Sequence, residues 1–291
     1  MPKKFLIVCL MPLFLANINC GEKSQNQSVA RKRAAIRRSS STSTEQTLNI
    51  SSQGAPSNLP VRQAREAASP KAGEIEPTDE FAGLRDKMVK YQLENRGVTN
   101  KKVLNTMRKV PRHLFIPERN RDEAYADHPV SIGKGQTISQ PYIVGLMTEL
   151  LDLKSTDKVL EIGAGSGYQA AILADICREV YTIEIIEDLG KKAERLLLDL
   201  GYKNIKVKIG DGYLGWPEKA AFDAIIVTCA PENIPEPLIE QLAEGGRMVI
   251  PVGDYPRQTL KRITKRNGKL NYEDIIAVLF VPMTGKAQRI K

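Results

Sequence analysis

The stretch Lys158-Val-Leu-Glu-Ile-Gly-Ala-Gly-Ser-Gly167 decides the fold. The apolar run Val159–Ile162 predicts a buried strand, three glycines then occupy every second position, and a helical segment begins at Tyr168. A strand, a glycine turn and a helix in this order let the backbone approach a nucleotide-like ligand closely. A second apolar run, Val180–Ile185, carries Glu184 about 20 residues further on, the spacing at which an acid bonds ribose hydroxyls. The pattern therefore predicts both a fold and a class of cofactor.

The spacing of the glycines separates two cofactor classes. Dinucleotide-binding turns follow the pattern G-x-G-x-x-G and hold a pyrophosphate at a helix N-terminus. This chain has G-x-G-x-G at Gly163, Gly165 and Gly167, preceded by Glu161. That arrangement resembles motif I of the S-adenosylmethionine-dependent methyltransferases, whose cofactor is a sulfonium cation without phosphate. An acidic site suits a cation, and the flanking strand, helix and Glu184 argue against an ordinary glycine turn.

Apolar runs and helical segments alternate from residue 158 onward. This alternation predicts an α/β fold, a doubly wound Rossmann-like sheet that is mostly parallel and has helices on both faces. The strands are expected at Val159–Ile162, Val180–Ile185, Ile205–Ile209, Ala224–Val227 and Met248–Ile250, with helices at Asp188–Leu200 and Pro237–Leu242.

The end of the chain predicts a C-terminal antiparallel hairpin. Leu260–Thr264 and Ile275–Val281 flank Asn267-Gly268, a favoured pair for a tight hairpin turn. A hairpin that closes a doubly wound sheet is typical of methyltransferases rather than dehydrogenases.

Ahead of the sheet, the sequence predicts an N-terminal helical subregion. Two amphipathic helices are expected to pack on the core, because their apolar residues recur at helical spacing. The first carries Phe81, Leu84, Met88 and Tyr91, and the second carries Val103, Leu104 and Met107 and stops at Pro111.

Residues 1–20 form a signal-like segment. Lys3 and Lys4 precede an apolar run, Phe5–Leu15, that is too short to span a bilayer. Cys20 before a glycine resembles a lipoprotein cleavage site, although the residues before it fit that pattern poorly. The protein is expected to be cytoplasmic, where S-adenosylmethionine is made. The alternatives are export or lipid anchoring through this segment, and a non-functional extension.

Residues 21–78 are expected to be a disordered linker, because a segment rich in Ser, Thr, Gln and Asn buries too little apolar surface to offset its chain entropy. Its basic cluster, Arg31 to Arg38, is interpreted as solvated, with contact to anionic lipid or nucleic acid as the alternative. The methyltransferase domain is assigned to residues 79–291.

Charge and ligand-type residues narrow the possible partners. The net charge is +9, but most of the excess precedes residue 78, so no nucleic-acid partner is expected. Cys177 and Cys229 lie among apolar neighbours and are expected to be buried thiols. His113 and His128 share no ligand-like spacing with cysteines or acids, so no metal site is expected. No feature demands an interface, and a monomer is expected.

Three segments ahead of the glycine turn carry a more specific resemblance. They are Val110-Pro-Arg-His-Leu-Phe-Ile-Pro-Glu118, Ala124-Tyr-Ala-Asp-His-Pro129 and Gly135-Gln-Thr-Ile-Ser-Gln-Pro-Tyr142. With Phe222-Asp-Ala-Ile-Ile-Val227 and Val281-Pro-Met-Thr284, they resemble the protein-L-isoaspartate O-methyltransferases over roughly Asp79 to Gly285. The resemblance implies a repair enzyme that methylates the free α-carboxylate of isoaspartyl residues in damaged proteins and peptides. The ester then cyclises to a succinimide, which hydrolyses partly to aspartate.

The same resemblance implies the roles of individual residues. Ser139 matches the active-site serine that orients the substrate carboxylate; from the residue alone, a helix N-cap is the alternative. The residues implied at the cofactor are Gln136, Thr137 and Ile138 in a loop over it, Gly163, Gly165 and Ser166 beneath its amino-acid end, Glu184 with Ile185 at the ribose, Asp211 and Gly212 near the adenine, and Thr284 from the C-terminal segment. For Asp211, an ordinary Asp-Gly turn is the alternative.

Two other functions remain open from the residues. One is methyl transfer to another carboxylate or a small molecule, because a fold does not fix a substrate. The other is a non-catalytic binding protein that docks through its basic tail. The segment around Ser139 argues against the first, and the intact glycines with Glu184 and Asp211 argue against the second.

Overall fold

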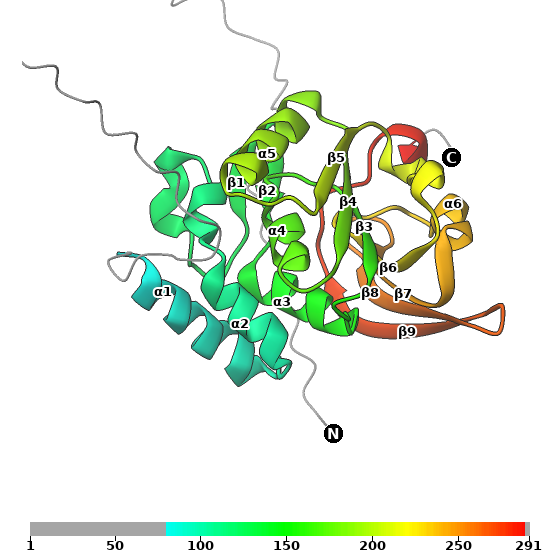
Figure 1. Cartoon of the computed structure of the whole chain (residues 1–291), viewed down its shortest axis with the longest axis horizontal. Helices are drawn as coiled ribbons and strands as arrows, with labels where there is room; N and C mark the ends of the chain where they lie inside the picture. The colour runs from blue at the N-terminus through cyan, green and yellow to red at the C-terminus, as the bar shows by residue number, and fades with distance from the viewer. Residues whose placement is uncertain (1–79, 289–291) are drawn as a thin grey trace, which may run out of the picture. The chain divides into compact units, whose positions relative to one another are not determined.

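A seven-stranded sheet lies at the centre of the computed structural model, which describes residues 80–288 (Figure 1). Its strands stand in the order β5-β4-β3-β6-β7-β8-β9. Their bounds are β3 Lys158–Ile162, β4 Glu179–Glu184, β5 Ile205–Ile209, β6 Phe222–Val227, β7 Leu242–Val252, β8 Gln258–Arg266 and β9 Lys269–Val278. The pairs from β5 to β7 are parallel, whereas β7–β8 and β8–β9 are antiparallel. The predicted doubly wound sheet with a C-terminal antiparallel hairpin is confirmed.

The order of the strands creates a crevice beside β3. The chain runs from β3 outward through β4 to β5, and then returns to the other side of β3 with β6. The connections leaving the carboxyl ends of β3 and β6 therefore diverge, and ligands of doubly wound sheets bind at such a switch point. This is where the glycine turn after Ile162 lies.

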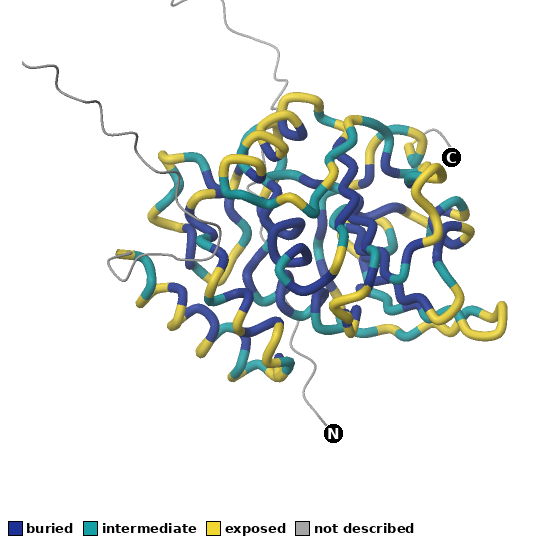
Figure 2. The backbone as a smooth tube through the Cα atoms, in the orientation of Figure 1, coloured by how far each residue is buried: buried dark blue, intermediate teal, exposed yellow. Residues whose placement is uncertain are grey.

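Helices cover both faces of the sheet. The α-helices of the described chain are α1 Ala82–Lys87, α2 Lys101–Lys109, α3 Pro141–Leu150, α4 Tyr168–Ala174, α5 Glu187–Asp199 and α6 Glu236–Glu240. A π-helical turn, η1 Met88–Leu93, follows α1. The 3₁₀ turns are η2 Glu94–Arg96, η3 Arg112–Phe115, η4 Glu118–Glu123, η5 Gly212–Leu214, η6 Pro217–Lys219 and η7 Gly285–Gln288. Helices α3, α4 and α5 pack on one face and α6 on the other, which gives two hydrophobic cores separated by the sheet. Figure 2 shows the buried positions concentrated in the central strands and in α4.

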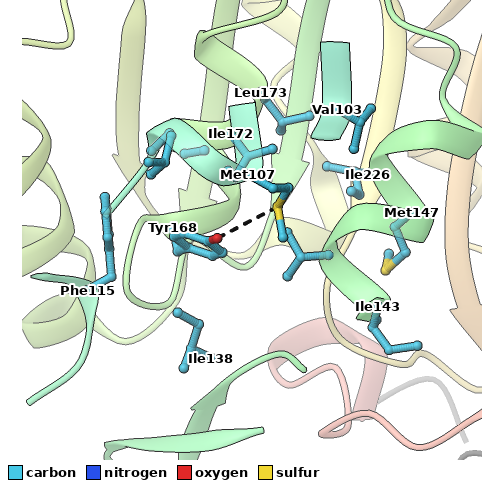
Figure 3. Close-up of a cluster of buried hydrophobic side chains, with 14 of the residues drawn as sticks. Val103, Met107, Phe115, Ile138, Ile143, Met147, Tyr168, Ile172, Leu173 and Ile226 are labelled. Carbon is cyan, nitrogen blue, oxygen red and sulfur yellow. Dashed lines mark hydrogen bonds between the residues drawn. The ribbon is translucent and has the colours of Figure 1, made fainter. Parts of the chain in front are cut away.

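The larger core joins the N-terminal helices to the sheet. Met107 of α2 and Tyr168 of α4 are fully buried, and the Tyr168 hydroxyl lies 3.7 Å from the Met107 sulfur (Figure 3). Phe115 packs edge-on against the Tyr168 ring, with the centroids 5.4 Å apart. The N-terminal subregion is thus anchored on the helix that follows the glycine turn.

The predicted inner face of the first N-terminal helix is wrong in part. Leu84 and Tyr91 are 44% and 64% exposed, whereas Arg85, Met88 and Val89 are buried. Leu84 lies ahead of the π-helical turn that begins at Met88, so its exposure is set by the orientation of α1, which turns Arg85 inward to donate to the Arg108 carbonyl at 2.8 Å. The second helix is as predicted, with Val103, Leu104 and Met107 buried along α2.

The segment predicted as a loop over the cofactor is a strand. Gln136–Ile138 forms β2, which pairs antiparallel with β1, Val130–Gly133. Lys134 and Gly135 connect them, both with positive φ, as a tight hairpin turn requires. The hairpin gives the segment a fixed conformation beside the sheet.

The predicted C-terminal hairpin turn is correct, but its second strand is displaced. Asn267 and Gly268 have φ of +51° and +69° and join β8 directly to β9. The strand expected at Ile275–Val281 ends at Val278, because the following segment leaves β8 and runs towards the end of β6.

Among residues 80–288, no helix is long and apolar enough to cross a bilayer. The predicted signal-like segment and linker lie outside the described residues.

Candidate active site at the carboxyl ends of β3, β4 and β6

One pocket gathers most of the residues that the sequence predicts at the cofactor. It lies at the carboxyl ends of the central strands, between the glycine turn, β2 and the C-terminal segment. Eight predicted residues line it: Gln136, Thr137, Gly163, Gly165, Glu184, Ile185, Gly212 and Thr284. The wall is completed by Ile162, Ile183, Ile186, Thr228, Cys229, Val281, Pro282 and Met283.

The glycine turn is held against the neighbouring strands. The amide of Gly163 donates to the carbonyl of Ile183 at 2.8 Å, and the Thr228 hydroxyl lies 2.8 Å from the Gly163 carbonyl oxygen. Gly163 has a φ of +97°, and a Cβ built on it would stand 2.5 Å from the Thr228 oxygen. Glycine is therefore required here for both conformation and space.

Glu184 fixes the other side of the turn. Its Oε2 accepts a hydrogen bond from the Gly165 amide at 2.8 Å, and its Oε1 accepts one from the Ile186 amide at 2.9 Å. The side chain is 6% exposed and lines the pocket. Each carboxylate oxygen has a second lone pair, so Glu184 retains two acceptor positions for ligand hydroxyls.

The C-terminal segment reaches the pocket through a short pairing with the end of β6. Ala230 and Pro282 form an isolated parallel bridge, and the Met283 amide donates to the Ala230 carbonyl at 2.8 Å. This contact brings Thr284 into the wall of the pocket.

Asp211 lies beside the pocket rather than in its wall. Its Oδ1 accepts from the Tyr213 amide at 3.0 Å and caps η5, and its Oδ2 accepts from the Lys286 amide at 2.7 Å. The adjacent Gly212 does line the pocket, and a Cβ on it would stand 2.3 Å from Ile162. The contacts of Asp211 are thus structural, since they secure the segment that carries Thr284.

Three predicted residues, Ile138, Ser139 and Ser166, do not line the pocket, although they follow the lining residues Thr137 and Gly165 in the sequence. Ile138 is buried, and Ser139 and Ser166 are half-buried. Gln140, not Ser139, is the N-cap of α3, so the alternative role of Ser139 as a helix cap is wrong. The Ser139 carbonyl accepts a hydrogen bond from Arg112 Nη2 at 2.7 Å.

The charge of the pocket is negative. Among the described residues that line it, Glu184 is the one acid and no lysine or arginine is present. Burial raises the pKa of the Cys229 thiol to about 12, so this side chain stays neutral at pH 7. Such a wall disfavours a pyrophosphate and suits a sulfonium cation with ribose hydroxyls. The residues present therefore fit S-adenosylmethionine.

Glu161, the acid of the glycine motif, does not reach the pocket. It is fully buried within the sheet, and neither of its carboxylate oxygens has a hydrogen-bond partner in the described part of the chain. Thr182, its register partner on β4, has an unpaired hydroxyl as well. Burial raises the pKa of Glu161 to about 8, so this side chain is mostly a neutral acid at pH 7.

Comparison with known proteins decides the family. The family model described as Protein-L-isoaspartate(D-aspartate) O-methyltransferase matches residues 84–288. The chain belongs to this family. Protein-L-isoaspartate O-methyltransferase 2 of Shewanella sediminis is 51% identical over 211 residues, which cover 72% of this chain and 86% of that protein. The protein-L-isoaspartate O-methyltransferase of Opitutus terrae is 55% identical over 201 residues, covering 69% and 86%.

Solved structures of protein-L-isoaspartate O-methyltransferases agree. One superposes with a TM-score of 0.65 at 28% identity and covers 70% of this chain and 67% of its own. A putative member from Plasmodium falciparum, crystallised in complex with S-adenosyl-L-homocysteine, gives a TM-score of 0.61 at 29% identity and covers 69% and 98%. The predicted family, fold and enzyme class are confirmed.

Sequence reasoning missed about half of the pocket wall of this methyltransferase. Thr228 and Cys229 follow β6, and the rule that ligands bind at the carboxyl ends of parallel strands would have found them. Cys229 was expected from the sequence only to be a buried thiol, and it is half-buried in the pocket wall. Val281 to Met283 belong to a segment that carries the family resemblance, but no local pattern places them in the wall, because the bridge to Ala230 that brings them there is long-range.

Proposed function

We propose that the pocket at the glycine turn holds S-adenosylmethionine, and that Ser139 orients the free α-carboxylate of an isoaspartyl residue beside it. The enzyme is a protein-L-isoaspartate O-methyltransferase and acts in the repair of damaged proteins. The observation that carries the cofactor assignment is the pocket wall, which combines a glycine turn with one acid and no basic residue among the described residues.

Individual residues have distinct roles in this proposal. Glu184 accepts hydrogen bonds from the ribose hydroxyls with its free lone pairs, and Ile185 packs beside it. Gly163 and Gly165 leave room for the amino-acid end of the cofactor, with Ser166 following them. Asp211 and Gly212 serve the adenine side. Gln136, Thr137 and Ile138 of β2 lie over the cofactor, and Thr284 forms part of the pocket wall.

The acceptor needs little activation from the protein. A carboxylate is ionised at neutral pH, so no residue has to act as general base. When bound, S-adenosylmethionine supplies an electrophilic methyl group on its sulfonium sulfur. The chain contributes orientation: the Ser139 hydroxyl donates to one carboxylate oxygen and leaves the other free to attack. Ordering two reactants in this way supplies about 7–11 kcal/mol of the barrier reduction.

The proposal extends to the cellular location and the oligomeric state of the enzyme. It acts as a monomer in the cytoplasm, where its cofactor is made, on isoaspartyl-containing proteins and peptides. Nucleic acid is not a partner, since most of the excess positive charge lies ahead of residue 78. The catalytic domain comprises residues 79–291.

The repair outcome is the test. An isoaspartyl peptide is incubated with the full chain and S-adenosylmethionine, and its isomers are followed by chromatography. The expected result is loss of the isoaspartyl peptide, transient succinimide and a growing fraction of aspartyl peptide. A methylated product that never passes through a succinimide contradicts transfer to the α-carboxylate of an isoaspartyl residue.

A further inference from the structure

Arg112 is a buried arginine with no carboxylate partner among the residues that the structure describes. Its side chain is 0% exposed, and its Nε and Nη2 donate at 2.7 Å to the carbonyls of Ala124 and Ser139. Nη1 has no hydrogen-bond partner, and Arg112 forms no ion pair within residues 80–288. Arg247, also buried, differs, because its Nη2 lies 2.7 Å from the Asp157 carboxylate.

An unpaired buried cation is costly. Burial without a counter-charge costs several kcal/mol per ion. The Arg112 guanidinium carbon lies 5.0 Å from the centre of the Tyr168 ring, a cation–π contact that offsets only part of this cost. Burial lowers the pKa of Arg112 to about 10, so the guanidinium remains protonated at neutral pH. Within residues 80–288, Arg112 is therefore a buried positive charge without a carboxylate partner.

The positive charge of Arg112 lies next to Ser139, the residue proposed to orient the substrate. Arg112 is bonded to Ser139, which follows the β2 residues Gln136 and Thr137 that line the pocket. The pocket wall itself carries the negative charge of Glu184, which repels an anionic acceptor. A carboxylate substrate at Ser139 thus needs a nearby positive charge, and Arg112 is a buried cation in contact with that residue.

We propose that Arg112 is a positioning and specificity residue that makes the site selective for a carboxylate. It fixes the Ser139 backbone through the carbonyl hydrogen bond and attracts the substrate α-carboxylate across the weakly screening interior. It acts through Ser139 rather than by touching the reacting atoms. This inference rests on the proposed function, because it assumes that the acceptor carboxylate lies at Ser139.

The test compares an isoaspartyl peptide with the same peptide carrying an α-carboxamide, which removes the charge but retains the shape. Binding of fluorescently labelled peptides to the full chain is measured by anisotropy with S-adenosylhomocysteine present. The variants are Arg112→Gln, which removes the charge, and Arg112→Lys, which retains it. Arg85→Gln is the matched control, since Arg85 is also buried but donates to the Arg108 carbonyl instead.

The expected result is a carboxylate preference of at least about tenfold in the wild-type protein, equivalent to about 1.4 kcal/mol. The preference falls below about twofold in Arg112→Gln and survives in Arg112→Lys and Arg85→Gln. A purely structural role weakens both peptides equally and leaves the preference intact in Arg112→Gln, which overturns the proposal.

If the Arg112→Gln variant does not fold, the Arg112→Lys variant tests the role of the charge instead. A folded lysine variant that retains the preference supports the role of the charge, and one that loses it overturns the proposal. The proposed function fails in a distinguishable way: the wild-type protein itself then shows no preference for the carboxylate peptide. When only the inference fails, the wild-type preference is present and does not depend on Arg112.

Discussion

The carboxylate of Glu184 lies 2.8 Å from the backbone amide of Gly165 and accepts its hydrogen bond. This contact joins the end of β4 to the glycine turn after β3, and it orients the one acid in the described pocket wall. In the proposed function, folding and ligand binding share this side chain: Glu184 stabilises the turn with one set of lone pairs, and the other set accepts from the ribose hydroxyls.

Replacement of Glu184 by alanine is expected to weaken cofactor binding by about tenfold or more, because hydrogen bonds to a charged group contribute about 1.5–3 kcal/mol. Calorimetric titration with S-adenosylhomocysteine measures the effect. Glu179→Ala, at the opposite end of β4, is the matched control and should bind normally. Equal affinity in the wild-type protein and Glu184→Ala would exclude a role for Glu184 at the ribose.

Replacement of Ser139 by alanine is expected to lower kcat for an isoaspartyl peptide by about tenfold or more, since one positioned donor to the carboxylate is lost. Affinity for S-adenosylhomocysteine should change less than about twofold. Ser131→Ala, on the exposed side of β1 in the same hairpin, should behave as wild type. A Ser139→Ala enzyme with full kcat would remove this residue from the reaction.

Replacement of Gly163 by alanine is expected to lower the free energy of unfolding by about 2 kcal/mol, from a strained positive φ and a clash with Thr228. Gly133→Ala is the control, because Gly133 has a similar φ of +92° but open space around it. Urea denaturation separates the strain from the clash. Equal losses in the two variants would mean that the Thr228 contact does not require a glycine.

Glu161 is expected to make stability depend on pH. Its pKa is raised from 4.5 to about 8, so the folded state holds a proton that the unfolded state releases, and stability falls as pH rises between these values. The slope is at most about 1.4 kcal/mol per pH unit. Glu161→Gln removes this contribution, so its stability relative to wild type should grow from pH about 5 to pH about 8. Urea denaturation curves that shift in parallel across this range would show that Glu161 does not titrate in this way.

Local sequence signals predicted those elements that depend on local chemistry. The strands around the glycine turn are mostly apolar runs, and the turn at Asn267 and Gly268 needs two residues that tolerate positive φ. Glu184 and Gly163 line the same pocket because the carboxyl ends of parallel strands lie at one edge of the sheet. For the same reason, eight of the predicted cofactor residues line one pocket.

Features that depend on distant contacts were not predictable. The exposed Tyr91 results from the orientation of the first helix, whose buried face is formed by Arg85, Met88 and Val89, with Arg85 donating to the distant Arg108 carbonyl. Besides its cap of η5, Asp211 accepts a hydrogen bond from the amide of Lys286, which is far away in sequence. The burial of Arg112 without a carboxylate partner could not be predicted from the sequence, because it depends on which side chains surround it in the described fold.

The central claim is tested most directly with two peptides that differ only in an aspartyl or isoaspartyl linkage. Each is incubated with the full chain and methyl-labelled S-adenosylmethionine, and base-labile methyl ester is counted. We predict ester on the isoaspartyl peptide alone. Ester on neither peptide, with S-adenosylhomocysteine binding intact, would contradict the repair function and leave a methyltransferase with a different acceptor.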